Sequence, residues 1–107
     1  MTITSTHFEA LGAGKRVSRM TVNGPSQYKQ TTKFEVIAPG KVTWAQVTLR
    51  NKPTGNEIIE YTWSGSTIKI TFSTISANTS TGAISKTEVA DNTDLSGLIL
   101  DILAEHE

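Results

Sequence analysis

Apolar and polar residues alternate in several short runs along this chain, and Gly, Pro and Asn separate the runs. A period of two is typical of antiparallel strands that bury one face and expose the other. In the clearest run, residues 67–73, three large apolar side chains share one face: Ile68, Ile70 and Phe72. The preceding run ends at Ser64-Gly65, which predicts a tight hairpin between the two.

Further segments predict additional strands. Residues 2–11 and 15–22 predict an N-terminal hairpin, residues 30–38 and 41–50 predict two central strands, and residues 83–90 predict a weaker final strand. Pro39-Gly40 is a turn sequence and should pair the two central strands. We expect residues 41–75 to form a three-stranded meander. Val42 and Trp44 break the alternation, which indicates either a bulge near Trp44 or cover on both faces there.

The end of the chain has a different period. Five apolar residues fall at the spacing of one helical face: Leu95, Leu98, Ile99, Ile102 and Leu103. Asp91, Asn92, Thr93 and Asp94 precede them and could cap a helix. The spacing therefore predicts an amphipathic helix over residues 93–106. A helix this short is marginal alone in water, so its apolar face should be buried against a sheet or a second subunit.

These elements together predict the fold class. We expect one α+β domain over residues 1–107, with a predominantly antiparallel β-sheet, an N-terminal hairpin and one C-terminal amphipathic helix. The β-rich body would span residues 2–90. A chain of 107 residues is long enough for one modest core, and the Ser and Thr content of about a quarter suits solvent-facing strand positions.

Charge is unevenly distributed along the chain. Residues 1–52 hold eight Lys or Arg against two Asp or Glu, and residues 53–107 hold two against eight, so the net charge is zero. Such a division can steer an acidic partner such as nucleic acid onto one surface, or bring the basic part of one copy to the acidic part of another. The chain has no cysteine, which excludes disulfides and thiolate metal sites.

No catalytic or cofactor motif is present in recognisable form. Residues 12–16 lack the Gly and the Ser or Thr that a phosphate-binding loop needs, so a hairpin turn is the better interpretation. His7 and His106 lie near opposite ends without carboxylates at metal-site spacing. We therefore expect a protein that is not an enzyme and that binds no cofactor, metal or small-molecule substrate.

The basic residues allow a binding surface. Arg50 and Lys69 fall on the polar faces of their strands, and Lys33 lies near a third. If these strands align in one sheet, cations, amides and hydroxyls would share a face that could contact RNA phosphates or bases. The alternative, an ordinary solvated sheet face, stays open.

The order of elements resembles that of the coat proteins of single-stranded RNA phages: a hairpin, a sheet and a C-terminal amphipathic helix in a small cysteine-free chain. The stretch from Asp91 to Leu100 is similar to the strand-to-helix junction of that family. The resemblance implies homodimers whose helices cover the partner's sheet, and whose bare sheet face holds packaged RNA. It assigns the subunit interface to Leu95, Leu98, Ile99, Ile102 and Leu103, and the RNA-facing role to Lys33, Gln46, Arg50, Lys69 and Thr71.

The function that follows from this interpretation is structural. We expect a self-assembling capsid protein of a bacteriophage virion, with itself and single-stranded RNA as partners. No apolar run is long enough to span a membrane, so we expect assembly in the host cytoplasm. A decoration or head-to-tail joining protein that binds another capsid protein is one alternative. A small phage-encoded inhibitor of a host nuclease is another.

Overall fold

A computed structural model describes residues 3–12, 15–77 and 80–107, with side chains described from Arg16 onward within those ranges. The described chain forms eight strands: β1 (Ile3–Gly12), β2 (Lys15–Asn23), β3 (Phe34–Ile37), β4 (Val42–Leu49), β5 (Glu57–Ser64), β6 (Thr67–Ala77), β7 (Ile84–Glu88) and β8 (Ile99–His106). These ranges contain no helix, so the predicted α+β class is wrong and the fold is all-β. The described residues therefore include no helix that could span a membrane.

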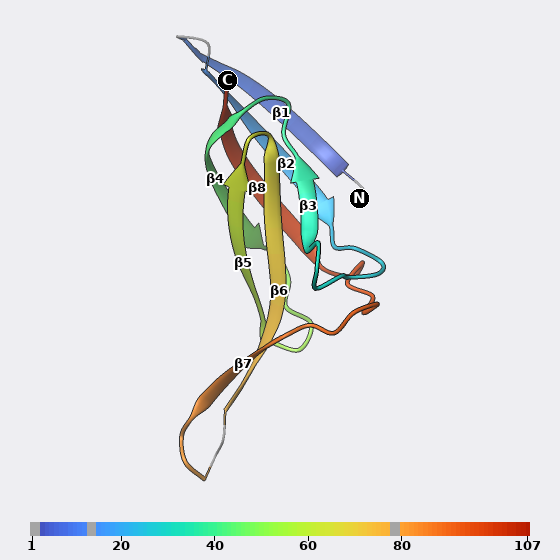
Figure 1. The fold of residues 1–107 in the computed structure, drawn as a ribbon. Helices are drawn as coiled ribbons and strands as arrows, with labels where there is room; N and C mark the ends of the chain where they lie inside the picture. The colour runs from blue at the N-terminus through green and yellow to red at the C-terminus, as the bar shows by residue number, and fades with distance from the viewer. Residues whose placement is uncertain (1–2, 13–14, 78–79) are drawn as a thin grey trace.

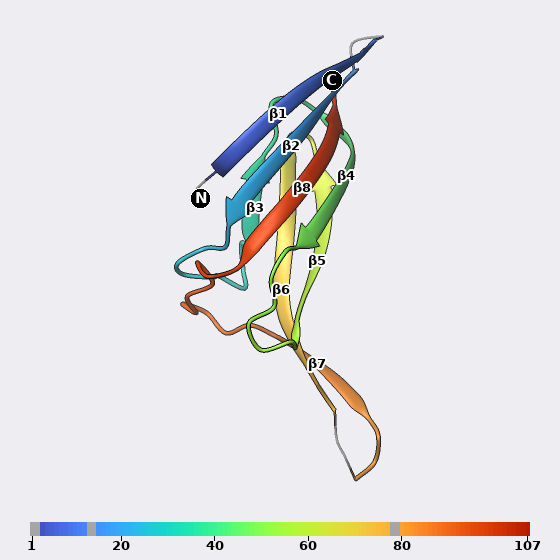
Figure 2. The same cartoon turned by 180° about the vertical axis from the view of Figure 1, so that it is seen from behind.

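The strands form two antiparallel sheets that face each other (Figure 1). One sheet has the order β1-β2-β8-β4, and the other has the order β3-β6-β5, with β7 pairing along the far end of β6. Seen from behind in Figure 2, β8 runs through the middle of the first sheet between β2 and β4. The arrangement is a β-sandwich, in which the inner faces of both sheets supply the core.

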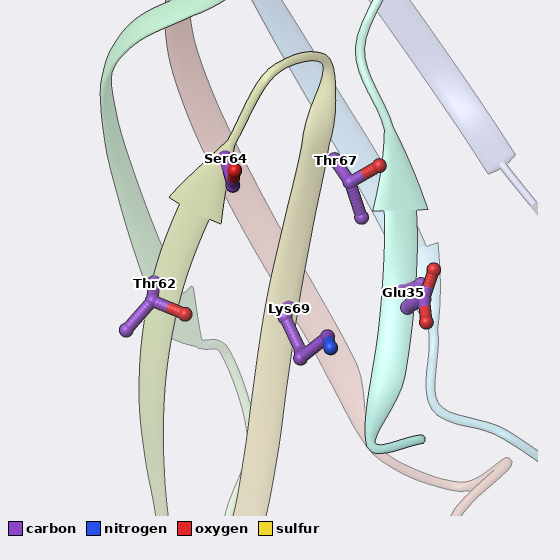
Figure 3. Close-up of a pocket in the computed structure, with 5 residues that line it drawn as sticks. All are labelled: Glu35, Thr62, Ser64, Thr67 and Lys69. Atoms are coloured by element: carbon purple, nitrogen blue, oxygen red, sulfur yellow. The ribbon is translucent and has the colours of Figure 1, made fainter.

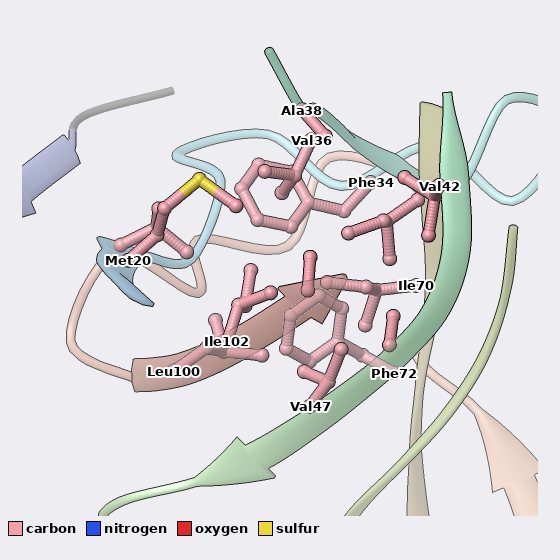
Figure 4. Close-up of a cluster of buried hydrophobic side chains, with 14 of the residues drawn as sticks. Met20, Phe34, Val36, Ala38, Val42, Val47, Ile70, Phe72, Leu100 and Ile102 are labelled. Atoms are coloured by element: carbon pink, nitrogen blue, oxygen red, sulfur yellow. The ribbon is translucent and has the colours of Figure 1, made fainter. Parts of the chain in front are cut away.

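The core lies between the sheets and takes side chains from both (Figure 4). Ile68, Ile70 and Phe72 of β6 are at most 1% exposed, which confirms the shared face predicted from their alternation. They pack in one cluster with β2 and β8 residues such as Val22 and Leu100. Burying a large aliphatic or aromatic side chain contributes about 1.5–3 kcal/mol, so this cluster supplies most of the stability.

The segment predicted as a helix over residues 93–106 contains strand β8 instead. Its residues alternate strictly between buried and half-buried, with Leu100, Ile102, Ala104 and His106 facing inward. Because β8 is an inner strand of its sheet, its outward residues Ile99 and Leu103 are also partly covered by neighbours. Apolar residues on both faces of a strand produced a spacing that also fits one face of a helix.

The predicted helix-capping residues form a loop before β8. The Asp94 carboxylate accepts hydrogen bonds from the backbone N–H (2.9 Å) and the hydroxyl (2.6 Å) of Ser96, which is an Asx turn. Asn92 adopts a positive φ of 67°, a conformation that Asn tolerates better than most residues. Local side-chain bonds to the backbone therefore favour a turn here rather than a helix.

Two predicted hairpins are confirmed, and the predicted pairing of the central strands is wrong. β1 pairs with β2, and β5 pairs with β6 through a two-residue turn in which Gly65 has a φ of 59°. β3 pairs with β6 and β4 pairs with β8, so the segments on either side of Pro39-Gly40 enter different sheets. For the same reason β4 does not join β5 and β6 in a meander.

The irregularity at the start of β4 is a bulge, which was one of the two predicted alternatives. The register with β8 shifts between Val42 and Trp44, which leaves Val42 buried and Trp44 44% exposed. Gly40 lies just before it, and a Cβ there would stand 1.9 Å from the carbonyl oxygen of Glu107. Glycine is required at this position because the end of the chain packs directly against the backbone.

Candidate assembly interface

The five predicted RNA-facing residues do not share a face. Gln46 of β4 and the following Arg50 belong to the sheet that contains β8, whereas Lys69 and Thr71 lie on β6 in the opposite sheet. Lys33 precedes β3 and has a positive φ of 60°. The single sheet on which the predicted RNA surface depended is therefore not formed.

Two of these cations are engaged within the fold. Arg50 Nε donates to Asp101 Oδ2 at 2.9 Å, and its Nη2 donates to Asp101 Oδ1 at 2.5 Å. These bonds lower the pKa of the Asp101 carboxyl. Lys33 Nζ lies 2.6 Å from Glu88 Oε2. Both pairs join the basic first half of the chain to the acidic second half, so pairing within one copy accounts for part of the charge division.

The outer face of the second sheet has a shallow depression (Figure 3). It has a volume of about 340 Å³ and is lined by Glu35, Thr62, Ser64, Thr67 and Lys69. Glu35 and Lys69 lie directly opposite each other on β3 and β6, so the two charges compensate locally. The depression is open and its lining is short and polar, without the apolar walls typical of small-molecule sites.

The predicted interface residues divide between the inside and the outside of the fold. Leu98 is 5% exposed and Ile102 is 3% exposed, and both belong to the core of their own copy. Leu95 packs against the edge of that core. Ile99 and Leu103 face outward from β8 and are half-buried. The structure thus does not bring these five residues together on one surface.

The one histidine whose side chain is described lies in the core. His106 is 1% exposed, and its Nε2 lies 2.6 Å from the Ser18 hydroxyl in the core, where substrate has no access. The side chain of His7 lies outside the described residues. Within the described ranges no group of three His, Asp or Glu side chains is placed to hold a metal ion.

The feature that stands apart from the sandwich is a two-stranded arm. We define the arm as residues 74–77 of β6 and residues 80–87, which include most of β7. Both views show it projecting from one end of the body (Figures 1 and 2), and it contributes to a molecular length of 55 Å against widths of 26 and 24 Å. β7 pairs with β6 alone. An isolated two-stranded hairpin is marginally stable in water, so the arm is a segment that benefits from a partner.

The arm has two different faces. Cross-strand pairs point to the same side, and the pairs Ile75–Lys86 and Ala77–Ile84 alternate with the hydroxyl pairs Thr74–Thr87 and Ser76–Ser85. Ile84 is 74% exposed, the largest exposed fraction among the large apolar side chains of the described chain. Lys86 lies two residues away on the same face and pairs with Glu60 of β5. The arm thus presents an apolar side chain beside a cation.

The root of the arm is fixed by a polar network. The buried Tyr28 hydroxyl donates to Glu88 Oε2 at 2.7 Å and accepts the backbone N–H of Phe72 at 3.3 Å. Phe72 lies on β6 between the stretch paired with β3 and the stretch paired with β7, so the hydroxyl occupies a gap in the ladder. Burial and the Glu88 contact raise the pKa of Tyr28 to about 12. Hydrogen bonds from Lys33 and Tyr28 lower the pKa of Glu88.

A groove lies beside this root. Its volume is about 250 Å³, and its surface is mostly apolar. It is lined by residues of the 53–57 loop, the start of the arm and the loop before β8: Pro53, Thr54, Glu57, Thr74, Asp94, Leu95, Gly97 and Leu98. We call it the root groove. It combines an apolar floor with two carboxylates.

The weak strand predicted at residues 83–90 is confirmed by β7, but its projection from the body as an arm does not follow from the sequence. The available signal was Ile84, a large apolar residue isolated in a stretch rich in Ser and Thr. The root groove could not be recognised, because its walls come from segments about 40 residues apart.

Comparisons with models of known protein families, with curated proteins and with solved structures found no match to this chain.

Proposed function

We propose that this chain is a structural protein that assembles with copies of itself, as the coat subunit of a virion does, and that a dimer is the first step. The observation that carries the proposal is the arm, which leaves the body and exposes Ile84 to solvent. A two-stranded hairpin alone is only marginally stable in water, so contact with a second copy would stabilise the arm.

The other sites on the described part of the chain fit an assembly role better than catalysis. The open depression between β3 and β5 is polar and locally neutral, and the buried His106 is inaccessible. RNA is not part of the proposal, because the five residues predicted to contact it lie on two sheets and Arg50 and Lys33 already bind carboxylates.

Sedimentation velocity over a concentration series tests the proposal. The wild-type chain should form dimers and larger species, and Ile84→Asp should shift the distribution to monomer. Ile37→Asp is the matched control, because Ile37 is 52% exposed on β3, away from the arm, and its substitution should leave assembly unchanged. A wild-type chain that stays monomeric at every concentration would overturn the proposal.

A further inference from the structure

The arm and the root groove are complementary in chemistry. The groove has Pro53, Leu95 and Leu98 in its lining, and a hollow of about 250 Å³ accommodates a branched aliphatic side chain. Ile84 is such a side chain, and 74% of it is exposed in its own copy. Removing both surfaces from water at once would provide a favourable apolar contribution to association.

Their charges are complementary as well. The groove carries the carboxylates of Glu57 and Asp94, and each is held by local hydrogen bonds. Thr54 N–H donates to Glu57 at 3.0 Å, and Ser96 N–H donates to Asp94 at 2.9 Å. The hydroxyls of Thr54 and Ser96 also donate to these carboxylates, and the hydroxyl and backbone bonds together lower the pKa of Glu57 and of Asp94. Lys86 follows Ile84 on the same face of the arm, so an arm that seats the isoleucine brings an ammonium to a carboxylate-bearing groove.

Lys86 can change partners at low cost. Its pair with Glu60 is exposed, with 51% and 56% of the two side chains accessible. Exposed ion pairs contribute little to stability, so exchanging this pair for one at the groove carries a small penalty.

The position of the groove favours reciprocal docking. Thr74, the first residue of the arm, lines the groove, so the groove lies at the arm's own root. From Glu88 to Ile84 the strand extends about 13 Å at 3.3 Å per residue, which carries Ile84 away from its own root. Thr74 and Ile84 lie on opposite faces of the arm, so two arms that cross about a twofold axis, rather than stack face to face, would bring each tip to the other's root.

We propose that two copies of this chain exchange arms reciprocally, each placing Ile84 in the root groove of the other with Lys86 beside Glu57 and Asp94. This inference rests on the proposed self-assembly and identifies its first contact. The interface is closed and isologous, so it ends at a dimer, and larger assemblies require other surfaces.

Charge reversal in the whole chain tests the docking, with the dimer dissociation constant measured by sedimentation. Lys86→Glu and Asp94→Lys should each weaken the dimer about tenfold, and the double variant should recover most of the loss. Two variants serve as controls. Glu60→Gln removes the partner of Lys86 within its own copy, and Lys41→Glu reverses an exposed charge far from the arm. Both should leave the dimer dissociation constant unchanged.

A plug variant gives a second measurement that does not involve charge. A Cβ at Gly97 meets no atom within 4 Å, so Gly97→Leu should fold normally, narrow the groove and weaken the dimer at least tenfold. If the wild-type chain dimerises but Lys86→Glu, Asp94→Lys and Gly97→Leu leave the constant unchanged, arm docking is overturned and self-assembly stands. If the wild-type chain does not self-associate, both proposals fail.

Discussion

The hydroxyl of Tyr28 connects the core to the root of the arm, and removing it tests how the arm is held. In Tyr28→Phe the ring stays in place, with its edge against Phe72 at a centroid distance of 5.6 Å and an interplanar angle of 84°. The substitution removes only the oxygen that accepts the Phe72 N–H and donates to Glu88.

The cost follows from what remains behind. The Phe72 backbone N–H lies where β6 passes from β3 to β7, and without the hydroxyl it is left buried and unbonded. An unsatisfied buried donor costs about 1–3 kcal/mol. We therefore expect the free energy of unfolding to fall by that amount.

Urea denaturation measures this change. With m-values of about 1–3 kcal/mol/M, the midpoint should fall by on the order of 1 M with an unchanged slope. Tyr61→Phe is the matched control, since it removes the same atom from a half-buried ring on β5 and should change stability by less than about 0.5 kcal/mol. Equal midpoints for the two variants would refute the role assigned to the Tyr28 hydroxyl.

Three further predictions concern stability. The pKa of Tyr28 is raised from 10 to about 12 in the folded state, so its contribution to the free energy of unfolding is complete below pH 10 and should be lost as pH rises toward 12. Denaturation at alkaline pH should show this loss in the wild type and not in Tyr28→Phe. Gly40→Ala should lower the free energy of unfolding by about 1–3 kcal/mol, because the added methyl overlaps the Glu107 carbonyl, and an unchanged melting temperature would contradict the close approach. Leu100→Ala should lower the free energy of unfolding by about 2–5 kcal/mol and Leu103→Ala by less, because only Leu100 is fully buried. The reverse order would favour a helix, whose apolar face would include Leu103 and exclude Leu100.

The comparison of Leu100 with Leu103 also shows where sequence reasoning failed. The alternation Leu98, Leu100, Ile102, Ala104 was present in the sequence, and Leu100 was the residue that the helical stripe could not place. The choice between the two periods is made by β2 and β4, which pair with β8 from 50 to 90 positions away in the chain. Pairing at that distance overrides local preference and cannot be recognised from local spacing.

Local features were predicted better than distant ones. The β5–β6 hairpin follows from its alternation and from Gly65, and the broken parity near Trp44 indicates a bulge as one of two alternatives. A common face for Arg50 and Lys69 requires their strands to align in one sheet, whereas β4 and β6 lie in opposite sheets. The depression and the root groove depend on such tertiary neighbours.

The absence of cysteine from the chain allows a direct test of arm exchange. Ile84→Cys and Leu95→Cys are made as separate single-cysteine proteins, mixed and oxidised, so that a disulfide between the two proteins can form only across copies. Reciprocal docking predicts a rapid disulfide-linked heterodimer of these two variants, and a much slower one when Ile37→Cys replaces Ile84→Cys. A mixture that self-associates but links Leu95→Cys no faster to Ile84→Cys than to Ile37→Cys would contradict the account.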